Sequence, residues 1–304
     1  MMPDVSIVVP TYNRKEKLRR LLESILSDVR CSYEIIVVDD CSTDGTDEMI
    51  KNLFPQVKYI RHNDIELVGK SRNDGILNSS SEYVFFVDDD NVVPRNTVEM
   101  LLQIIRNDTS IGVVAPVTCY LSVPEKVMYA GAKFDRFMFR SRFLFVKSDA
   151  SELTGKVIEI DKAANSYMIR KSAVESAGLI DYPRYAVFEE EGELIYKIKL
   201  KSYRTLVTGE ARVFHDVPFE ETVTYDKIKE FRAYFSIRSK LFFTRDFSPG
   251  ILKIPGLIFT IFVAFPHYAF RYVIPARSKR FKMAKALLFG MIDGLVGNEK
   301  LRYR

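Results

Sequence analysis

Three consecutive aspartates, Asp88, Asp89 and Asp90, follow the apolar run at residues 83–87. Adjacent carboxylates repel one another, so a folded chain keeps them together only where something cationic neutralises them. Mg²⁺ and Mn²⁺ prefer carboxylate oxygens and leave coordination positions open for phosphate oxygens. The cluster therefore indicates a divalent-metal site. The alternative is a solvated acidic turn after a strand.

Polar side chains also follow two earlier β-branched runs. Residues 5–9 predict a buried strand that leads into a polar loop, and residues 34–38 predict a second strand that ends at Asp39 and Asp40. We expect Asp39 to cap a helix or to be solvated. Residues 57–61 and 83–87 predict two further strands, and residues 15–26 predict a helix.

The alternation of strands and helices over the first 115 residues predicts βαβ units and a mostly parallel sheet. In such sheets, ligands bind beyond the carboxyl ends of the strands. We therefore expect three groups to share one site: Thr11, Tyr12 and Asn13 after the first strand, Asp39 and Asp40 after the second, and the three aspartates.

The chain has 304 residues, of which 47% are hydrophobic and 28% charged, a balance typical of a globular protein with a sizeable core. This length suits one large domain or two closely joined ones. The net charge of +5 suits either a phosphorylated ligand or an anionic membrane surface. Cys31, Cys41 and Cys119 form no CxxC pair, which favours a reducing cytoplasm. We expect no signal peptide at the N-terminus.

The later part of the chain is less regular. Residues 156–161 predict a strand, and residues 169–177 predict a helix. Residues 254–270 carry no formal charge, which is near the lower limit for a membrane span. Pro255 and Pro266 interrupt this run and favour an in-plane or re-entrant segment over a clean crossing. His62 and His267 have no chemically suggestive neighbours and receive no role.

The C-terminal segment predicts a basic amphipathic helix, which suits an anionic membrane leaflet. The alternative is a helical pair that packs on the protein's own core or on a partner subunit. Lys282 and Lys285 lie near one apolar helical face, which comprises Phe281, Leu288, Met291, Ile292 and Leu295.

Four blocks, taken in order, resemble family 2 glycosyltransferases, which are inverting enzymes of the GT-A fold. The blocks are residues 5–14, 34–46, 70–75 and 86–90; the resemblance is strong over residues 5–95 and looser to about residue 215. It implies an α/β, Rossmann-like, mostly parallel sheet flanked by helices, with a C-terminal helical membrane-associating segment. Residues 1–115 would bind the nucleotide sugar, residues 116–247 would form the acceptor-binding and catalytic half of the same domain, and residues 248–304 would form the C-terminal helical region.

The resemblance also implies roles for individual residues. Asp40 would accept a hydrogen bond from the nucleotide base, commonly uracil. Arg72 would help to hold the nucleotide, and the alternative for it is a surface ion pair. Asp88 would lie near the ribose, and Asp90 would be the direct ligand of Mn²⁺ or Mg²⁺. His215 would be an additional metal or diphosphate contact, and the alternative for this histidine is a structural role after a strand. The other donor-binding residues would be Pro10, Thr11, Tyr12, Asn13 and Asp89.

The catalytic base is expected in the acidic run before Leu194. Inversion needs a carboxylate on the face of the sugar opposite the leaving group, to take the proton of the acceptor hydroxyl. The resemblance places Glu191 where the family has its aspartate base, with Glu190 beside it and Glu189 able to exchange roles. Clustered carboxylates could raise one pKa towards neutrality. The alternative is a solvated charge run at a helix start.

The implied reaction moves a sugar from a UDP-, GDP- or dTDP-sugar to an acceptor hydroxyl. Segment 234–240 and the tail at 285–295 resemble relatives that act on membrane or cell-surface glycans, so a lipid-linked or cell-surface glycan acceptor is expected. The enzyme would lie at the cytoplasmic face of the cell membrane, as a peripheral or monotopic protein, with a single span as the alternative. It would bind no nucleic acid. A nucleotidyltransferase and a non-catalytic sugar-nucleotide-binding or membrane scaffold protein are the alternatives. A nucleotidyltransferase would need a glycine-rich phosphate-binding loop near the N-terminus, and residues 10–14 contain no glycine.

Overall fold

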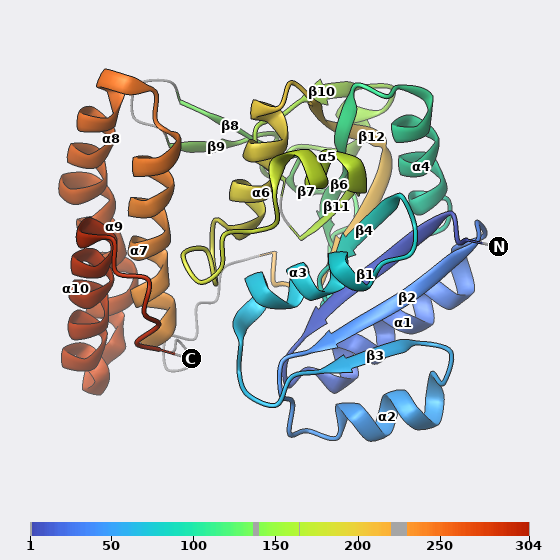
Figure 1. Cartoon of the computed structure of the whole chain (residues 1–304), viewed down its shortest axis with the longest axis horizontal. Coiled ribbons are helices and arrows are strands. Elements are labelled where there is room, and N and C mark those ends of the chain that lie inside the picture. Colours follow the sequence, from blue (N-terminus) through green and yellow to red (C-terminus); the bar gives the residue numbers. More distant parts are fainter. Residues whose placement is uncertain (1, 136–139, 164, 220–229, 304) are drawn as a thin grey trace.

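The computed structural model describes residues 2–135, 140–163, 165–219 and 230–303. In this part of the chain, a large sheet is covered by helices on both faces, and a layer of C-terminal helices stands against one side of the α/β body (Figure 1). The α/β fold expected from the alternation of strands and helices is therefore confirmed.

The N-terminal half of the sheet is parallel and runs in the order β3-β2-β1-β4. Strands β1, β2 and β4 are mostly apolar and largely buried, as parallel strands generally are, whereas the edge strand β3 is exposed at both ends. Their bounds are β1 (Val5–Thr11), β2 (Tyr33–Asp39), β3 (Lys58–Arg61) and β4 (Tyr83–Val87).

The second half of the sheet continues from β4 through the antiparallel strand β11 (Ser166–Arg170). Next come β6 (Ile111–Tyr120), β12 (Arg204–His215), which is parallel to β6, and β10 (Val157–Glu159). The remaining strands are β5 (Asn91–Val92) on β12, β7 (Val127–Tyr129) on β6, and a separate pair, β8 (Ala132–Phe134) and β9 (Ser141–Phe143).

The helix expected over residues 169–177 begins two residues later than predicted. Ile169 and Arg170 belong to β11, where they pair with Val84 and Tyr83 of β4. The helix itself is α5 (Lys171–Ala177). Pairing with a buried strand therefore decides the conformation of two residues that the local pattern assigned to the helix.

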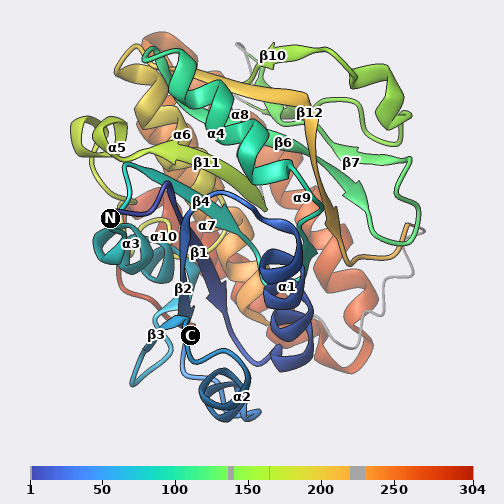
Figure 2. The same cartoon turned by 90° about the vertical axis from the view of Figure 1, so that its right-hand side faces the viewer.

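Helices cover the two faces of the sheet in separate sets (Figure 2). One apolar cluster joins one face to α1 (Lys15–Asp28), α2 (Thr46–Leu53) and α4 (Thr97–Asn107). The other joins the opposite face to α3 (Leu67–Asn78), α5 and α6 (Glu190–Leu200). Within β1, Ile7 and Val9 belong to the first cluster and Val8 to the second, which is the alternation expected of a strand.

The helix α7 (Glu230–Phe247) joins the α/β body to the C-terminal layer. Its side chains from Ala233 to Thr244 are buried all around, as in a helix with neighbours on every side. Phe242 and Phe243 pack into the core beside α6, and Leu241 packs into a third cluster with the final helix, α10 (Arg280–Val296).

Between α7 and α10, the chain forms one long apolar helix, Gly250–Ala276, which by length and composition could cross a membrane. It begins with a 3₁₀ turn (Gly250–Leu252) and continues through α8 (Lys253–Phe259), a π-helical stretch (Thr260–Ala264), α9 (Phe265–Tyr268) and a second π-helical stretch (Ala269–Val273). It ends within another 3₁₀ segment (Ile274–Lys279). Pro255 and Pro266 lie inside this helix and do not end it, and the in-plane or re-entrant placement of the segment stays a prediction. The π-helical turns on both sides of Pro266 are one way in which a helix accommodates a missing N–H.

The C-terminal helix α10 has one buried face and one exposed face. Met283, Ala286 and Leu287 of α10 are buried against the protein's own core. The apolar face predicted from the sequence is largely exposed: the solvent-accessible fraction is 81% for Phe281 and 44% for Leu288.

Candidate active site

A cavity of about 760 Å³ lies at the carboxyl ends of β1, β2 and β4. Thr11 ends β1, Asp40 follows β2 and Asp88 follows β4, so the three strand ends meet at one cavity, as expected, although Asn13 and Asp39 are not part of its lining. The predicted residues in its lining are Pro10, Thr11, Tyr12, Asp40, Arg72, Asp88, Asp89, Asp90, Glu190, Glu191 and His215.

Asn13 and Asp39 hold the loops of the site rather than line it. The backbone N–H of Asn13 donates to Ser42 Oγ at 2.8 Å, and the Asn13 side-chain oxygen accepts from the Thr43 N–H at 2.8 Å. Asp39 is fully buried and accepts hydrogen bonds from the Ser42 N–H at 3.0 Å and from the Tyr59 hydroxyl. The solvated alternative for Asp39 is therefore wrong, and both residues tie neighbouring loops together.

The three aspartates are neutralised by arginines of the same chain. Arg14 Nη1 lies 2.9 Å from both Asp89 Oδ1 and Asp90 Oδ2, and Arg72 Nη2 lies 2.7 Å from Asp88 Oδ1. The acidic triplet therefore does not by itself require a metal, contrary to the first argument from sequence. Arg14 was not predicted, although it directly follows the loop after β1. Burial raises the pKa of Asp89 to about 6, against the charge of Arg14.

Asp90 and His215 form the part of the cavity that suits a divalent cation. Asp90 Oδ1 lies 3.1 Å from His215 Nε2, and Asn165 Nδ2 lies 2.8 Å from His215 Nδ1. Burial opposes ionisation of Asp90, but the hydrogen bond and charge of His215, together with Arg14, hold its pKa at about 2. Adjacent ligands of an octahedral ion lie about 3 Å apart, so this oxygen and this nitrogen fit one ion.

Within the described ranges, no three His, Cys, Asp or Glu side chains gather as a metal cluster. An ion at Asp90 and His215 would therefore take its other ligands from phosphate oxygens and water, as Mg²⁺ commonly does. The residues present fit such an ion only together with a phosphorylated ligand.

Arg72 and two glutamates form a second charged centre. Arg72 is only 1% exposed; its Nη1 lies 2.7 Å from Glu190 Oε1, and its Nη2 lies 2.7 Å from Glu191 Oε1. Glu191 Oε1 also accepts a hydrogen bond from the Asn165 N–H at 3.1 Å. Burial raises the pKa of both glutamates, and the charge of Arg72 opposes that rise. A surface ion pair for Arg72 and a solvated charge run for the glutamates are therefore wrong.

A strained turn directs these glutamates. Phe188 and Glu189 both have a φ of 58°, a region that is unfavourable for side chains with a Cβ. α6 begins at the next residue, so Glu190 and Glu191 reach the cavity from its first turn, where the helix dipole favours carboxylates. Glu189 pairs with Lys162 at 2.7 Å instead. Positive φ values also occur in the other site loops, at Asn13, Cys41, Leu67 and Asn165.

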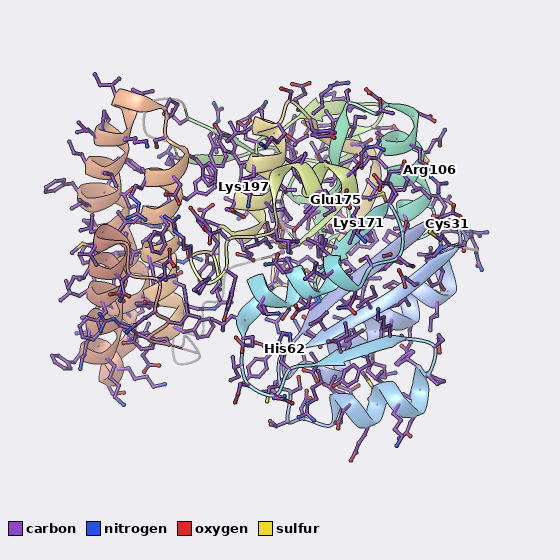
Figure 3. All side chains as sticks on the ribbon, in the orientation of Figure 1. Cys31, His62, Arg106, Lys171, Glu175 and Lys197 are labelled. Carbon is purple, nitrogen blue, oxygen red and sulfur yellow. The ribbon has the colours of Figure 1, made fainter. Side chains whose placement is uncertain are left out.

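Asp40 is fixed by three hydrogen bonds. It accepts from the backbone N–H groups of Glu66 at 2.7 Å and Leu67 at 2.9 Å, and its Oδ1 lies 2.9 Å from His62 Nδ1. The other nitrogen of His62 lies 2.9 Å from Asp74 Oδ2. Figure 3 labels His62, which follows β3. Sequence reasoning gave this histidine no role, because neither carboxylate partner is near it in the chain.

Two further cations reach the cavity from the helical layer. Arg232 belongs to α7 and Arg271 to the long apolar helix, and both line the cavity. Among the described residues, neither guanidinium forms an ion pair, whereas Arg14 and Arg72 are bound to carboxylates. The composition of the apolar helix gave no signal that its arginine faces this cavity.

The comparisons with known proteins agree with this fold. The sequence model of glycosyl transferase family 2 matches residues 6–171. An uncharacterized glycosyltransferase of Haemophilus influenzae is 34% identical over 110 residues, which are 36% of this chain and 37% of that protein. A GalNAc(5)-diNAcBac-PP-undecaprenol beta-1,3-glucosyltransferase of Campylobacter jejuni is 34% identical over 106 residues, 34% of each chain. The matched segment thus spans about a third of these relatives.

Two solved structures share the fold at low sequence identity. GalNAc-T7 with UDP, GalNAc and Mn²⁺ superposes with a TM-score of 0.61 at 17% identity, over 94% of this chain and 55% of that one. A mannosyltransferase from Pyrobaculum calidifontis with GDP-Man and Mn²⁺ gives 0.58 at 18% identity, over 98% and 88%. Because the family match covers more than half of the residues and the fold agrees, the chain belongs to glycosyl transferase family 2.

Proposed function

We propose that this protein is an inverting glycosyltransferase that moves a sugar from a nucleotide donor to an acceptor hydroxyl. One observation carries the proposal: a single cavity holds both the Asp90–His215 pair and the glutamates bound to Arg72. The first pair suits the diphosphate end of a donor with its metal ion. The second offers a carboxylate for the acceptor. The solved neighbours that contain UDP or GDP-Man with Mn²⁺ support a nucleotide donor.

Asp90 and His215 would hold a divalent ion such as Mn²⁺ or Mg²⁺. When bound, the ion supplies Lewis-acid stabilisation of the charge that grows on the leaving diphosphate. The low pKa of Asp90 keeps this carboxylate ionised across the physiological range. Arg14 lies against the same carboxylate, so its guanidinium would add positive charge close to the departing phosphates.

Glu191 is the proposed general base. It would accept the proton of the acceptor hydroxyl as the new glycosidic bond forms and the bond to the diphosphate breaks. Burial raises its pKa, which makes the carboxylate a better proton acceptor, while Arg72 and the Asn165 N–H hold its Oε1 in place. Glu190 lies on the other nitrogen of the same guanidinium and is the alternative base.

The acceptor is proposed to be a glycan on a lipid carrier. The Campylobacter relative is named for an undecaprenol-linked substrate, which supports this class. In this chain, the cavity borders the exposed apolar helix through Arg271, and Arg232 lies in the same lining. Two guanidiniums without carboxylate partners among the described residues suit the phosphate of such a carrier.

The test compares Asp90→Ala, Glu191→Gln and Glu190→Gln with the wild type. Donor binding is measured by thermal shift with each common sugar nucleotide, with and without Mn²⁺, because a ligand stabilises the state that it binds. Transfer and slow donor hydrolysis are measured by release of the nucleotide. We expect Asp90→Ala to lose the Mn²⁺-dependent shift.

Glu191→Gln is expected to keep that shift and to lose turnover by about 100-fold or more, as for a missing general base. Glu190→Gln is the matched control, since it loses a carboxylate on the same arginine, and it should keep more activity. If Glu190→Gln is the inactive variant, the roles are exchanged. Full transfer activity in both glutamine variants would exclude a base in this pair.

A further inference from the structure

A second cavity, of about 700 Å³, lies in the helical layer between the start of α7, helix α10 and the C-terminal segment. Its lining is basic and aromatic, with Lys282, Lys285, Arg302, Phe231, Phe289 and Tyr303. Phe231 also lines the cavity of the proposed active site, called the catalytic cavity from here on, so the two cavities adjoin at this ring.

The charges of this second cavity do not balance. Arg302 is already bound to Asp293, with Nε 2.6 Å from Oδ2 and Nη2 2.9 Å from Oδ1. Among the described residues, Lys282 and Lys285 have no carboxylate within ion-pair distance, and Glu230 is the one acidic residue in the lining. Lys285 Nζ lies 5.5 Å from the centre of the Phe289 ring. Two ammonium groups are therefore free to bind an anion.

The position of the cavity on α10 indicates what kind of anion it could take. Lys282, Lys285 and Phe289 are three and four residues apart, so they share one helical face. The neighbouring face of the same helix carries the exposed side chains Phe281, Leu288, Ile292 and Leu295. A ligand that enters between these faces meets positive charge at one end and apolar surface along its length.

We propose that this cavity binds the phosphate of an anionic phospholipid, whose acyl chains lie along the exposed apolar face of α10. Lysine ammonium groups bind phosphate as point charges, and basic clusters beside an apolar surface attract anionic lipids. The aromatic rings pack beside the glycerol and upper acyl segments, where amphipathic side chains are favoured at a membrane interface. This inference concerns a site outside the catalytic cavity and does not depend on the proposed reaction.

The test is flotation of the 304-residue protein with vesicles of phosphatidylcholine, alone or with about 30 mol% phosphatidic acid, a composition at which electrostatic attraction is measurable. We expect phosphatidic acid to strengthen binding, and the double variant K282A/K285A to weaken that binding by roughly tenfold or more. The matched control is K279A/R280A, which removes two exposed charges just before the cavity at the start of the same helix.

A general electrostatic effect would weaken both double variants equally, and that result would overturn the site. Soluble dihexanoyl phosphatidic acid and inorganic phosphate supply the second measurement, by calorimetry below the micelle concentration. The wild type should bind the short lipid saturably and inorganic phosphate at least tenfold more weakly, with no saturable binding of the lipid to K282A/K285A. Equal affinity for inorganic phosphate would overturn the lipid assignment. Both lysines are exposed, so the variants should fold as the wild type does.

Discussion

His62 links two carboxylates that lie on different elements. Its Nδ1 is 2.9 Å from Asp40 Oδ1, and its Nε2 is 2.9 Å from Asp74 Oδ2. Because both ring nitrogens face carboxylate oxygens, the imidazolium is the form that donates to both. The hydrogen bond to Asp40 raises the pKa of His62, burial opposes this rise, and Asp74 adds to it. Lys70 also forms an ion pair with Asp74, so the imidazolium and this ammonium group together balance the carboxylates of Asp40 and Asp74.

We predict that donor binding and stability both weaken as the pH rises through the pKa of His62 in the folded protein. This pKa lies above its unfolded value, so the contribution is complete below the unfolded value and is lost on deprotonation. His62→Ala should lower donor affinity by roughly tenfold near neutral pH, the value of one charge-assisted hydrogen bond. Calorimetry of donor binding at several pH values measures both effects.

Lys70→Ala is the matched control for His62→Ala, because among the described residues Lys70 forms an ion pair with Asp74 but none with Asp40. It should change donor affinity by less than the histidine variant and should keep the pH dependence. If His62→Ala binds the donor as the wild type does at every pH, then Asp40 is held by the backbone of Glu66 and Leu67 alone.

The acids of the site could be predicted from the sequence, but their partners could not. Asp88, Asp89 and Asp90 are adjacent and follow an apolar strand, so local pattern sufficed to find them. The Arg72 side chain that binds Glu190 lies 118 residues away in the chain, and Arg14 lies 75 residues from Asp89. Such pairs depend on how the sheet is assembled, which residue spacing does not report.

At the scale of elements, β1, β2 and β4 follow from the sequence because each is a short, mainly apolar run that ends at polar residues. The prediction of β4 at residues 83–87 was right at both ends. The boundary between β11 and α5 was wrong, since pairing with β4 overrides the local helical pattern at Ile169 and Arg170. Likewise, the long helix continues through Pro266, because π-helical turns beside it take up the irregularity.

Packing of α10 on α7 depends on two glycines. A Cβ at Gly290 would lie 2.2 Å from the carbonyl oxygen of Tyr234, and a Cβ at Gly294 would lie 2.8 Å from Leu241 Cβ. These helices therefore approach one another at backbone contact. A side chain at Gly290 would meet backbone atoms, which cannot rotate away, so the helices would have to separate.

We predict that Gly290→Val destabilises the protein by about 2 kcal/mol or more, since overpacking costs ~1–3 kcal/mol and valine has no strong helix preference to offset it. The midpoint of unfolding in urea, followed by circular dichroism, measures the change. Ala284→Val, at an exposed position of the same helix, serves as the control and should shift the midpoint little. An equal effect of both variants would contradict the close-packing explanation.

The whole molecule divides its chemistry between two surfaces. The α/β body supplies the acids, Arg14, Arg72 and His215 of the proposed active-site cavity, and the helical layer supplies Arg232 and Arg271 at its border. The same layer exposes a large apolar surface, since only 11% of the most apolar 18-residue stretch of its long helix is buried inside the protein. An exposed apolar surface of this kind marks an interaction site, and basic residues beside it favour a membrane.

We therefore predict that the helical layer lies in the membrane interface with Arg271 towards the catalytic cavity, rather than with the long helix crossing the bilayer. Phe262 and Phe270 of this helix are 72% and 68% exposed. The double variant F262S/F270S should lose flotation with neutral phosphatidylcholine vesicles, because each buried aromatic ring contributes about 1.5–3 kcal/mol of transfer free energy.

The control L53S/L77S removes two exposed apolar side chains from the α/β body, at 57% and 64% exposure, and should float as the wild type does. Because neither pair lines the catalytic cavity, donor hydrolysis in solution should stay unchanged in both. Vesicle binding that survives F262S/F270S, or that falls equally in L53S/L77S, would place the membrane-binding surface elsewhere on the molecule.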